Sequence, residues 1–196
     1  MGKKGVKTET QPIDWDDAMM LLDRLRDKDD NSRLMFACGF YFGLRISDVL
    51  LLRWIHILGD HFTIKEEKNE KHRRITLNDN FKLIRDQVIA NLREPPNEEE
   101  LIFIYKRKGS DKNKPISITA ANKRIKKYFT LYKIKVENPS SHTLRKTFGK
   151  KVYESNGCSE DALVKLSEVF NHSNVAITRR YIGLTRKVIE DIYLSI

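Results

Sequence analysis

Hydrophobic positions recur with a helical period along most of the chain. Ala18, Leu22 and Leu25 lie three or four residues apart and follow Asp14, a residue type that often caps a helix. Residues 34–42 are almost all apolar and predict a buried helix. Helices are expected over residues 14–25, 34–42, 46–54, 81–92, 119–132, 143–154, 160–170, 175–181 and 185–196.

The hydrophobic period changes over residues 55–77. Apolar and polar side chains alternate there, as at residues 62–64, which is typical of a strand with one exposed face. Gly59–Asp60 is a dipeptide that favours hairpin turns. We expect a small antiparallel sheet of two or three strands with a polar turn near residues 68–72, and a further short strand over residues 101–104. The predicted fold class is α+β, mainly helical with a small antiparallel sheet.

The charge of the chain is strongly basic. It has 37 Lys and Arg against 27 Asp and Glu, a formal net charge of +10. Such an excess favours polyanions through direct attraction and counterion release, without distinguishing DNA from RNA or an anionic membrane. Residues 106–135 hold eleven Lys and Arg with Asp111 as the single acid, so their local surplus equals the net charge of the whole chain.

The residue types that hold metals are not clustered in the sequence. Cys38 and Cys158 form no CxxC or Cys/His group, which argues against a metal site and leaves a disulfide open. No signal peptide is evident, and the longest apolar stretches are far below the ~20 residues that span a bilayer. We expect a soluble cytoplasmic protein without a cofactor.

Three segments place arginine, histidine and tyrosine in a fixed order. They read Gly-Leu-Arg-Ile-Ser-Asp-Val-Leu at residues 43–50, Ser-His-Thr-Leu-Arg-Lys-Thr-Phe at residues 141–148, and Phe-Asn-His-Ser at residues 170–173 followed by Thr-Arg-Arg-Tyr at residues 178–181. This ordered set resembles the three motifs of the tyrosine recombinase (phage integrase) family, and the resemblance covers about residues 14–196. It implies a catalytic domain that breaks and rejoins DNA.

The arginines suit chemistry at a phosphodiester. Attack on phosphorus builds negative charge on the non-bridging oxygens, which guanidinium groups hold with paired, charge-assisted hydrogen bonds. Arg45 and Arg145 are the candidates. His142 lies three residues before Arg145 and would share its helix face. By the resemblance, His142 transfers the proton of the attacking tyrosine or binds phosphate. An ordinary surface, capping or core role is the alternative for each residue.

Tyr181 is the candidate nucleophile. A phenol has a pKa of about 10, so it needs a nearby base or cations to react at neutral pH. The resemblance assigns His172, nine residues earlier, a hydrogen bond to the phosphate. The family usually has Leu-Gly-His at this turn, and here Asn171 replaces the glycine. Asparagine tolerates left-handed backbone better than most residues, so the turn is expected to survive. A packed aromatic residue is the alternative for Tyr181.

The resemblance also implies a lysine that protonates the leaving oxygen. Lys68, in the expected hairpin, fits this role best, although the glycine that usually follows it is missing. Lys65 and Lys71 are alternatives. Asp48 resembles an acid of the first motif and would orient groups there or form a helix salt bridge. Lys146 stands where many relatives have a second histidine, a position outside the principal catalytic set.

The domain organisation follows from the same resemblance. Residues 1–12 are polar and are expected to form a flexible tail, with the catalytic domain over residues 13–196. Relatives commonly carry an N-terminal core-binding domain, which we expect to be absent. The chain is then an excised fragment or a naturally short enzyme. Its last helix would pack on its own domain or dock on a neighbouring copy in a homo-oligomer on DNA.

Duplex DNA is the expected partner, with no membrane or small-molecule cofactor. Part of the basic window is expected to contact DNA phosphates, the alternative being a solvated face. The candidates are Lys106, Arg107, Lys108, Lys123, Arg124, Lys126 and Lys127. The expected activity is site-specific recombination through a 3′-phosphotyrosyl intermediate. A type IB topoisomerase-like enzyme and a non-catalytic DNA-binding protein are the alternatives.

Overall fold

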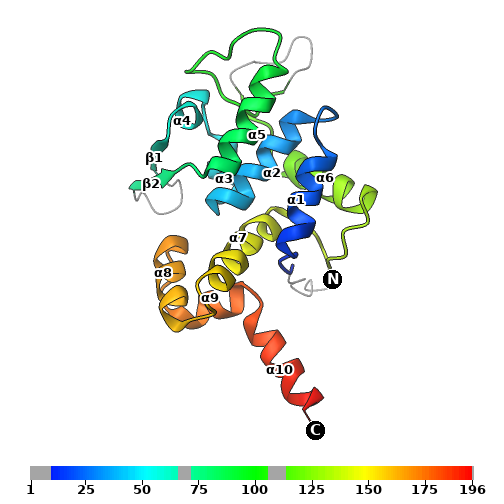
Figure 1. Ribbon diagram of the computed structural model, residues 1–196, viewed down its shortest axis with the longest axis vertical. Coiled ribbons are helices and arrows are strands. Elements are labelled where there is room, and N and C mark those ends of the chain that lie inside the picture. The colour runs from blue at the N-terminus through cyan, green and yellow to red at the C-terminus, as the bar shows by residue number, and fades with distance from the viewer. Residues whose placement is uncertain (1–9, 66–71, 106–113, 196) are drawn as a thin grey trace, which may run out of the picture.

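The computed structural model describes residues 10–65, 72–105 and 114–195. Helices predominate in these residues, as predicted (Figure 1). They are α1 (Trp15–Arg24), α2 (Asp30–Phe42), α3 (Ile46–Leu50), α4 (Trp54–Leu58), α5 (Asp79–Ala90), α6 (Ile118–Leu131), α7 (Ser141–Ser155), α8 (Glu160–Phe170), α9 (Val175–Tyr181) and α10 (Leu184–Leu194).

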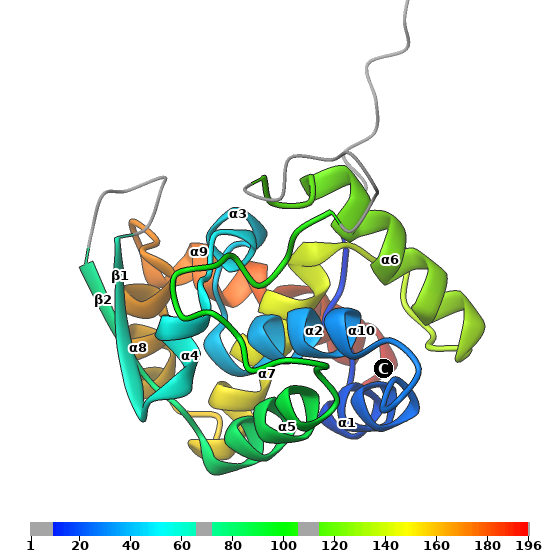
Figure 2. The ribbon, with the colours of Figure 1, turned by 90° about the horizontal axis from the view of Figure 1, so that it is seen from above.

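The sheet consists of two antiparallel strands, β1 (His61–Lys65) and β2 (His72–Thr76). Phe62 pairs with Ile75 in the register, and both are buried on the same face. The small antiparallel sheet is therefore confirmed. The β1–β2 pair and α6 lie on opposite sides of the molecule (Figure 2). The mainly helical α+β fold class is confirmed as well.

Three local expectations are wrong, and tertiary pairing explains two of them. The helix expected over residues 46–54 is divided into α3 and α4, because the chain between them pairs with a later segment: Ile102 N donates to Leu52 O at 3.0 Å and Trp54 N to Glu100 O at 3.1 Å. Residues 101–104 form isolated bridges instead of a strand. Gly59–Asp60 precedes β1 and is not a hairpin turn.

The expected boundary of the flexible tail at residue 12 is also wrong. Thr10 is buried, and its Oγ1 lies 2.6 Å from Thr143 Oγ1 of α7. Ile13 N donates to Thr147 Oγ1 at 3.0 Å. Residues 10–13 are therefore packed on α7. Residues 1–9 lie outside the described residues.

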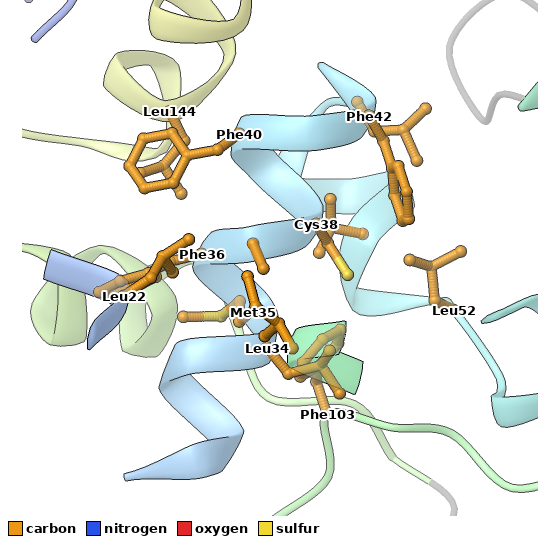
Figure 3. Close-up of a cluster of buried hydrophobic side chains, with 14 of the residues drawn as sticks. Leu22, Leu34, Met35, Phe36, Cys38, Phe40, Phe42, Leu52, Phe103 and Leu144 are labelled. Carbon is orange, nitrogen blue, oxygen red and sulfur yellow. The ribbon is translucent and has the colours of Figure 1, made fainter. Parts of the chain in front are cut away.

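Buried apolar side chains form two clusters with α7 between them. The larger cluster surrounds α2, where Phe40 lies beside Leu144 of α7 (Figure 3). The smaller one is formed by α8 and the residues after α9, including Phe170 and Ile182, and Phe148 of α7 packs against it. Because α7 contributes to both clusters, it fixes their relative position.

Two glycines let the helices approach closely. A Cβ on Gly149 of α7 would lie 2.7 Å from Ile182 Cγ2 and 2.9 Å from the Phe170 ring. Gly43 ends α2 with φ +57°, and a Cβ there would lie 2.3 Å from the Phe148 ring. The first residue of the Gly-Leu-Arg motif thus has both a conformational and a packing reason to be glycine.

We expect Gly149→Ala to lower the free energy of unfolding by about 2 kcal/mol, because overpacking outweighs the ~1 kcal/mol by which alanine favours a helix. Urea unfolding measures this. Gly59→Ala is the matched control, since the nearest atom to its Cβ would be 3.9 Å away. A Gly149→Ala variant as stable as wild type would show that α7 is not packed this closely on Phe170 and Ile182.

Candidate active site

The N-terminal turn of α7 places His142 and Arg145. Ser140 caps this helix: its side chain accepts from His142 N, and Thr143 Oγ1 accepts from Ser140 N. Arg145 follows His142 by three positions, so the two side chains share one face of α7. His142 keeps part of its side chain exposed to solvent and part covered, whereas Arg145 is only 4% exposed.

Arg145 joins the ends of two helices. Its Nη1 donates to Gly43 O at 2.7 Å, after α2, and its Nη2 donates to Phe170 O at 3.1 Å, at the end of α8. Its guanidinium carbon also lies 4.5 Å from the Phe170 ring centroid. Carbonyls at helix C-termini carry partial negative charge, so they stabilise a buried cation.

Arg73 of β2 makes a parallel connection between the same two helix ends. Its Nη2 donates to Phe42 O at 2.9 Å, and its Nη1 donates to Val169 O at 3.2 Å. Sequence reasoning did not identify this role. Arg73 stands among several other basic residues in the sequence, and nothing local distinguishes it from them. Its carbonyl partners come from distant segments, so only the folded chain reveals its role.

Arg45 lies at the N-cap of α3, two residues after the left-handed Gly43. Its side chain is half-buried and lines the same cleft as His142 and Arg145. The turn at Gly43 therefore directs the first-motif arginine toward the second motif. The acid of that motif, Asp48, is buried in α3.

His172 is presented by the turn that follows α8. Asn171 adopts the expected left-handed conformation with φ 52°, and His172 N donates to Ser167 O at 2.9 Å. His172 Nδ1 lies 2.8 Å from Thr178 Oγ1, a buried hydroxyl of α9. Burial, together with the charges of Arg145 and Arg45, lowers the pKa of His172 to about 4. His172 is therefore neutral near pH 7.

Tyr181 ends α9 and is half-buried. Its Oη lies 3.2 Å from His142 Nδ1, and its ring packs edge-on against Phe170 and His172. Burial raises the pKa of Tyr181, while the charges of Arg145 and Arg45 and a hydrogen bond from Arg145 oppose this rise. Burial and the same cations, with Lys146, lower the pKa of His142. A neutral His142 is able to accept a proton.

These groups converge on one cleft of about 420 Å³. Its lining contains Arg45, His142, Arg145, Asn171, His172, Ser173, Ile177 and Tyr181. Five of the six predicted catalytic residues thus lie together, although they come from three distant segments. The sixth, Lys68, lies outside the described residues. A larger hollow of about 630 Å³ lies between the start of α2 and the loop after α5, and it contains none of the five.

The predicted DNA contacts on α6 differ in their environments. Lys123, Lys126 and Lys127 are exposed. Arg124 is half-buried and donates from Nη1 to Asn31 Oδ1 at 2.6 Å, so part of its guanidinium serves an internal contact. Lys106, Arg107 and Lys108 lie outside the described residues.

Two further properties concern metals and membranes. Among the described residues, no group of three or more His, Cys, Asp or Glu is placed to hold a metal ion. Cys38 is buried, Cys158 is exposed, and both are free thiols. No helix within residues 10–65, 72–105 or 114–195 has the length and apolar character needed to cross a bilayer.

Comparison with known proteins identifies the class. Residues 12–187 match the model of the phage integrase family. A relative, the probable integrase/recombinase YoeC of Bacillus subtilis (strain 168), is 33% identical over 165 residues, which are 82% of this chain and 81% of the relative. The fold is that of a tyrosine recombinase catalytic domain, and the chain belongs to the phage integrase family. The predicted resemblance is confirmed.

Solved structures share the fold at low sequence identity. The XerH site-specific recombinase, in a post-cleavage complex with a palindromic difH substrate, matches with a TM-score of 0.70 and 16% identity, over 98% of this chain and 55% of that chain. The XerA recombinase matches with a TM-score of 0.68 and 15% identity, over 97% and 66%. A lambda integrase dimer bound to a COC′ core site matches with a TM-score of 0.65 and 14% identity, over 92% and 49%. This chain therefore spans about half of the XerH chain.

The low pKa of His172 predicts a stability that depends on pH. The unfolded histidine takes up a proton near pH 6.5, whereas the folded one does so near pH 4. Stability contributed by neutral His172 is thus present above pH 6.5 and lost as the pH falls toward 4. We expect His172→Gln to reduce the difference in unfolding free energy between pH 7 and pH 5 by about 1 kcal/mol, allowing for solvent screening. Urea titrations at both pH values measure it, and an unchanged difference would contradict the low pKa.

Proposed function

We propose that this chain is the catalytic part of a site-specific recombinase that cleaves and rejoins duplex DNA through Tyr181. The observation that supports this most is the convergence of two arginines and two histidines around the Tyr181 hydroxyl in one cleft. Guanidinium groups match phosphate oxygens, and a phenol beside a neutral histidine is suited to nucleophilic attack. The shared family and the DNA-bound recombinases with this fold also support it.

The proposed reaction begins when Tyr181 Oη attacks the scissile phosphorus. His142 Nδ1, at 3.2 Å, accepts the phenol proton. The bond from phosphorus to the 5′ oxygen breaks, leaving a 3′-phosphotyrosyl link and a free 5′ hydroxyl. Attack by the 5′ hydroxyl of a partner strand reverses the step and completes strand exchange. The phosphotyrosyl link conserves the energy of the broken phosphodiester, so rejoining needs no separate energy source.

The other residues stabilise charge as it moves. Arg45 and Arg145 are proposed to hold the non-bridging oxygens, where negative charge grows in the transition state. Neutral His172 donates a further hydrogen bond to the phosphate. Lys68 is proposed to protonate the departing 5′ oxygen, because that oxygen would otherwise leave as an alkoxide.

The DNA is proposed to extend from the cleft along α6. A second hollow of about 280 Å³ shares Arg45, His142 and Arg145 with the cleft and is bordered by Ile118 and Asn122 of α6. Lys126 follows Asn122 by one helical turn and is exposed. These positions support phosphate contacts by the lysines of α6. Because its substrate is DNA, we expect the protein to act in the cytoplasm.

Assembly of several copies on DNA is also proposed. Helix α10 follows the nucleophile directly and extends away from the rest of the molecule (Figure 1). Its exposed apolar side chains include Val188, Ile192, Tyr193 and Leu194. An exposed apolar face on a projecting helix supports contact with a second copy.

Nicked suicide duplexes with a randomised core test the proposed chemistry. They trap the covalent intermediate because the short strand after the nick diffuses away. We expect a metal-independent protein–DNA adduct on a denaturing gel, which is lost in Tyr181→Phe and kept in the control Tyr193→Phe. Arg45→Ala should form the adduct about 100 to 1,000 times more slowly, since a lost oxyanion donor costs about that much. An adduct that survives in Tyr181→Phe would identify another nucleophile, and no adduct on any core sequence would favour a binding protein.

The proposed path of the DNA predicts a specific salt dependence. We expect Lys126→Ala to weaken binding similarly for all sequences and to reduce the slope of log affinity against log salt by about 0.9, one phosphate contact. Fluorescence anisotropy with a labelled duplex over a salt series measures this. Lys165→Ala on α8, whose lysine pairs with Asp161, removes the same charge elsewhere and should leave the slope unchanged. Equal slopes for both variants would exclude a phosphate contact by Lys126.

A further inference from the structure

One face of α7 holds the segment that precedes α1. Residues on this face recur at helical spacing and bind residues 10–14 through hydroxyl and ammonium groups. The pairs are Thr143 with Thr10, Lys146 with Thr10, Thr147 with Ile13, and Lys150 with Asp14. The adjoining face carries His142 and Arg145. The segment and the site therefore share a single rigid helix.

Lys146 connects this segment to the nucleophile. It is only 4% exposed, and its Nζ donates to Thr10 O at 2.7 Å. The same Nζ lies 5.1 Å from the centroid of the Tyr181 ring. Its ammonium thus bridges a main-chain carbonyl of the N-terminal segment and the π face of the attacking residue.

The charge of Lys146 acts on the Tyr181 ring at short range, in a buried environment that water screens poorly. A cation over an aromatic face is attracted to the ring, and more strongly when the phenol becomes a phenolate. This charge also contributes, after burial, to lowering the pKa of His142, whose Nδ1 lies 3.2 Å from the Tyr181 hydroxyl. The Thr10 carbonyl stabilises the buried ammonium with a hydrogen bond, as a buried charge requires.

The N-terminal segment also touches the turn after the nucleophile. Gly183 starts α10 with φ +87°, and a Cβ there would lie 3.0 Å from Gln11 Oε1 and 3.6 Å from the Pro12 ring. Residues 10–12 therefore contact the chain on both sides of Tyr181 in the sequence. The contact before it is with Lys146 of α7, and the contact after it is with Gly183.

We propose that Lys146 is a positioning residue that favours the phenolate form of Tyr181. Residues 10–12 then belong to the active site, because the Thr10 carbonyl fixes the Lys146 ammonium against the Tyr181 ring. The assignment of Tyr181 as nucleophile rests on the proposed function, whereas the contact itself does not. It follows that displacement of residues 10–12 would change the reactivity of Tyr181 without touching a catalytic residue.

The effect of Lys146 has to be separated from that of other charges near the phenol. Among the residues that the structure describes, the titratable and charged groups that face Tyr181 are Arg45 at the start of α3, His142, Arg145 and Lys146 on α7, and His172 after α8. A variant at residue 146 leaves the other four in place. Lys146→Met removes the ammonium and keeps the volume of the stem, whereas Lys146→Arg keeps the charge.

The experiment titrates Tyr181 in the DNA-free full chain labelled with 3-fluorotyrosine. Fluorination makes the phenol more acidic, so the lysines stay charged during the titration. Comparison with Tyr181→Phe assigns the ¹⁹F resonance. We expect Lys146→Met to leave about ten times less phenolate at a given pH, Lys146→Arg to stay close to wild type, and Lys150→Met, which loses a segment contact away from the phenol, to match wild type. Identical titrations of Lys146→Met and wild type would overturn the proposal.

Adduct formation on the suicide duplexes gives an independent readout. Unlabelled Lys146→Met is expected to form the adduct about tenfold more slowly than unlabelled wild type at pH 7. Labelling with 3-fluorotyrosine is expected to restore most of that rate, because the more acidic phenol depends less on the cation. A defect that fluorotyrosine does not restore would indicate a merely structural role. If wild type forms no adduct, the proposed function fails while the titration still decides the role of Lys146.

Discussion

The structure depends on one buried cation, the guanidinium of Arg145, and on the two helix ends that it joins. Isolated in a core, such a charge would cost several kcal/mol. Here it donates to Gly43 O after α2 and to Phe170 O at the end of α8. Helix C-termini have unpaired carbonyls and partial negative charge. The carbonyls therefore stabilise the guanidinium charge, and the guanidinium supplies the hydrogen-bond donors that the carbonyls lack. The same contacts hold the smaller apolar cluster against the larger one and place the guanidinium, the proposed phosphate ligand, in the cleft.

The electrostatic character of the cleft follows from this arrangement. Burial, helped by cations that include Arg145 and Arg45, lowers the pKa of both histidines. The same arginines oppose the effect of burial on the pKa of Tyr181. In the proposed chemistry the histidines are neutral before the reaction, so one accepts a proton and the other donates a hydrogen bond. A phosphate in the cleft would add negative charge where the protein has concentrated positive charge, which is the preorganisation that phosphoryl transfer needs.

Helix α7 explains how a small domain performs several tasks with few elements. One face packs on α2 through Leu144, a second carries His142 and Arg145, and a third binds the N-terminal segment through Lys146. A rigid helix keeps these three faces at fixed angles. The proposed nucleophile, by contrast, lies on the short helix α9, which Thr178 anchors to His172.

The sequence by itself determined most of the helices, the small antiparallel sheet and the family, because hydrophobic period and motif spacing are local signals. It also indicated that Asn171 would adopt a left-handed turn, a property of that residue type. Contacts between distant residues decided the rest. The division of residues 46–54 into two helices depends on pairing with residues 100–102, and the packing of Thr10 depends on α7. The carbonyl partners of Arg73 and Arg145, and the position of Lys146 over Tyr181, exist only once separate segments are folded together. No local pattern records them, since backbone carbonyls are the same in every residue and ring contacts depend on the angle between helices.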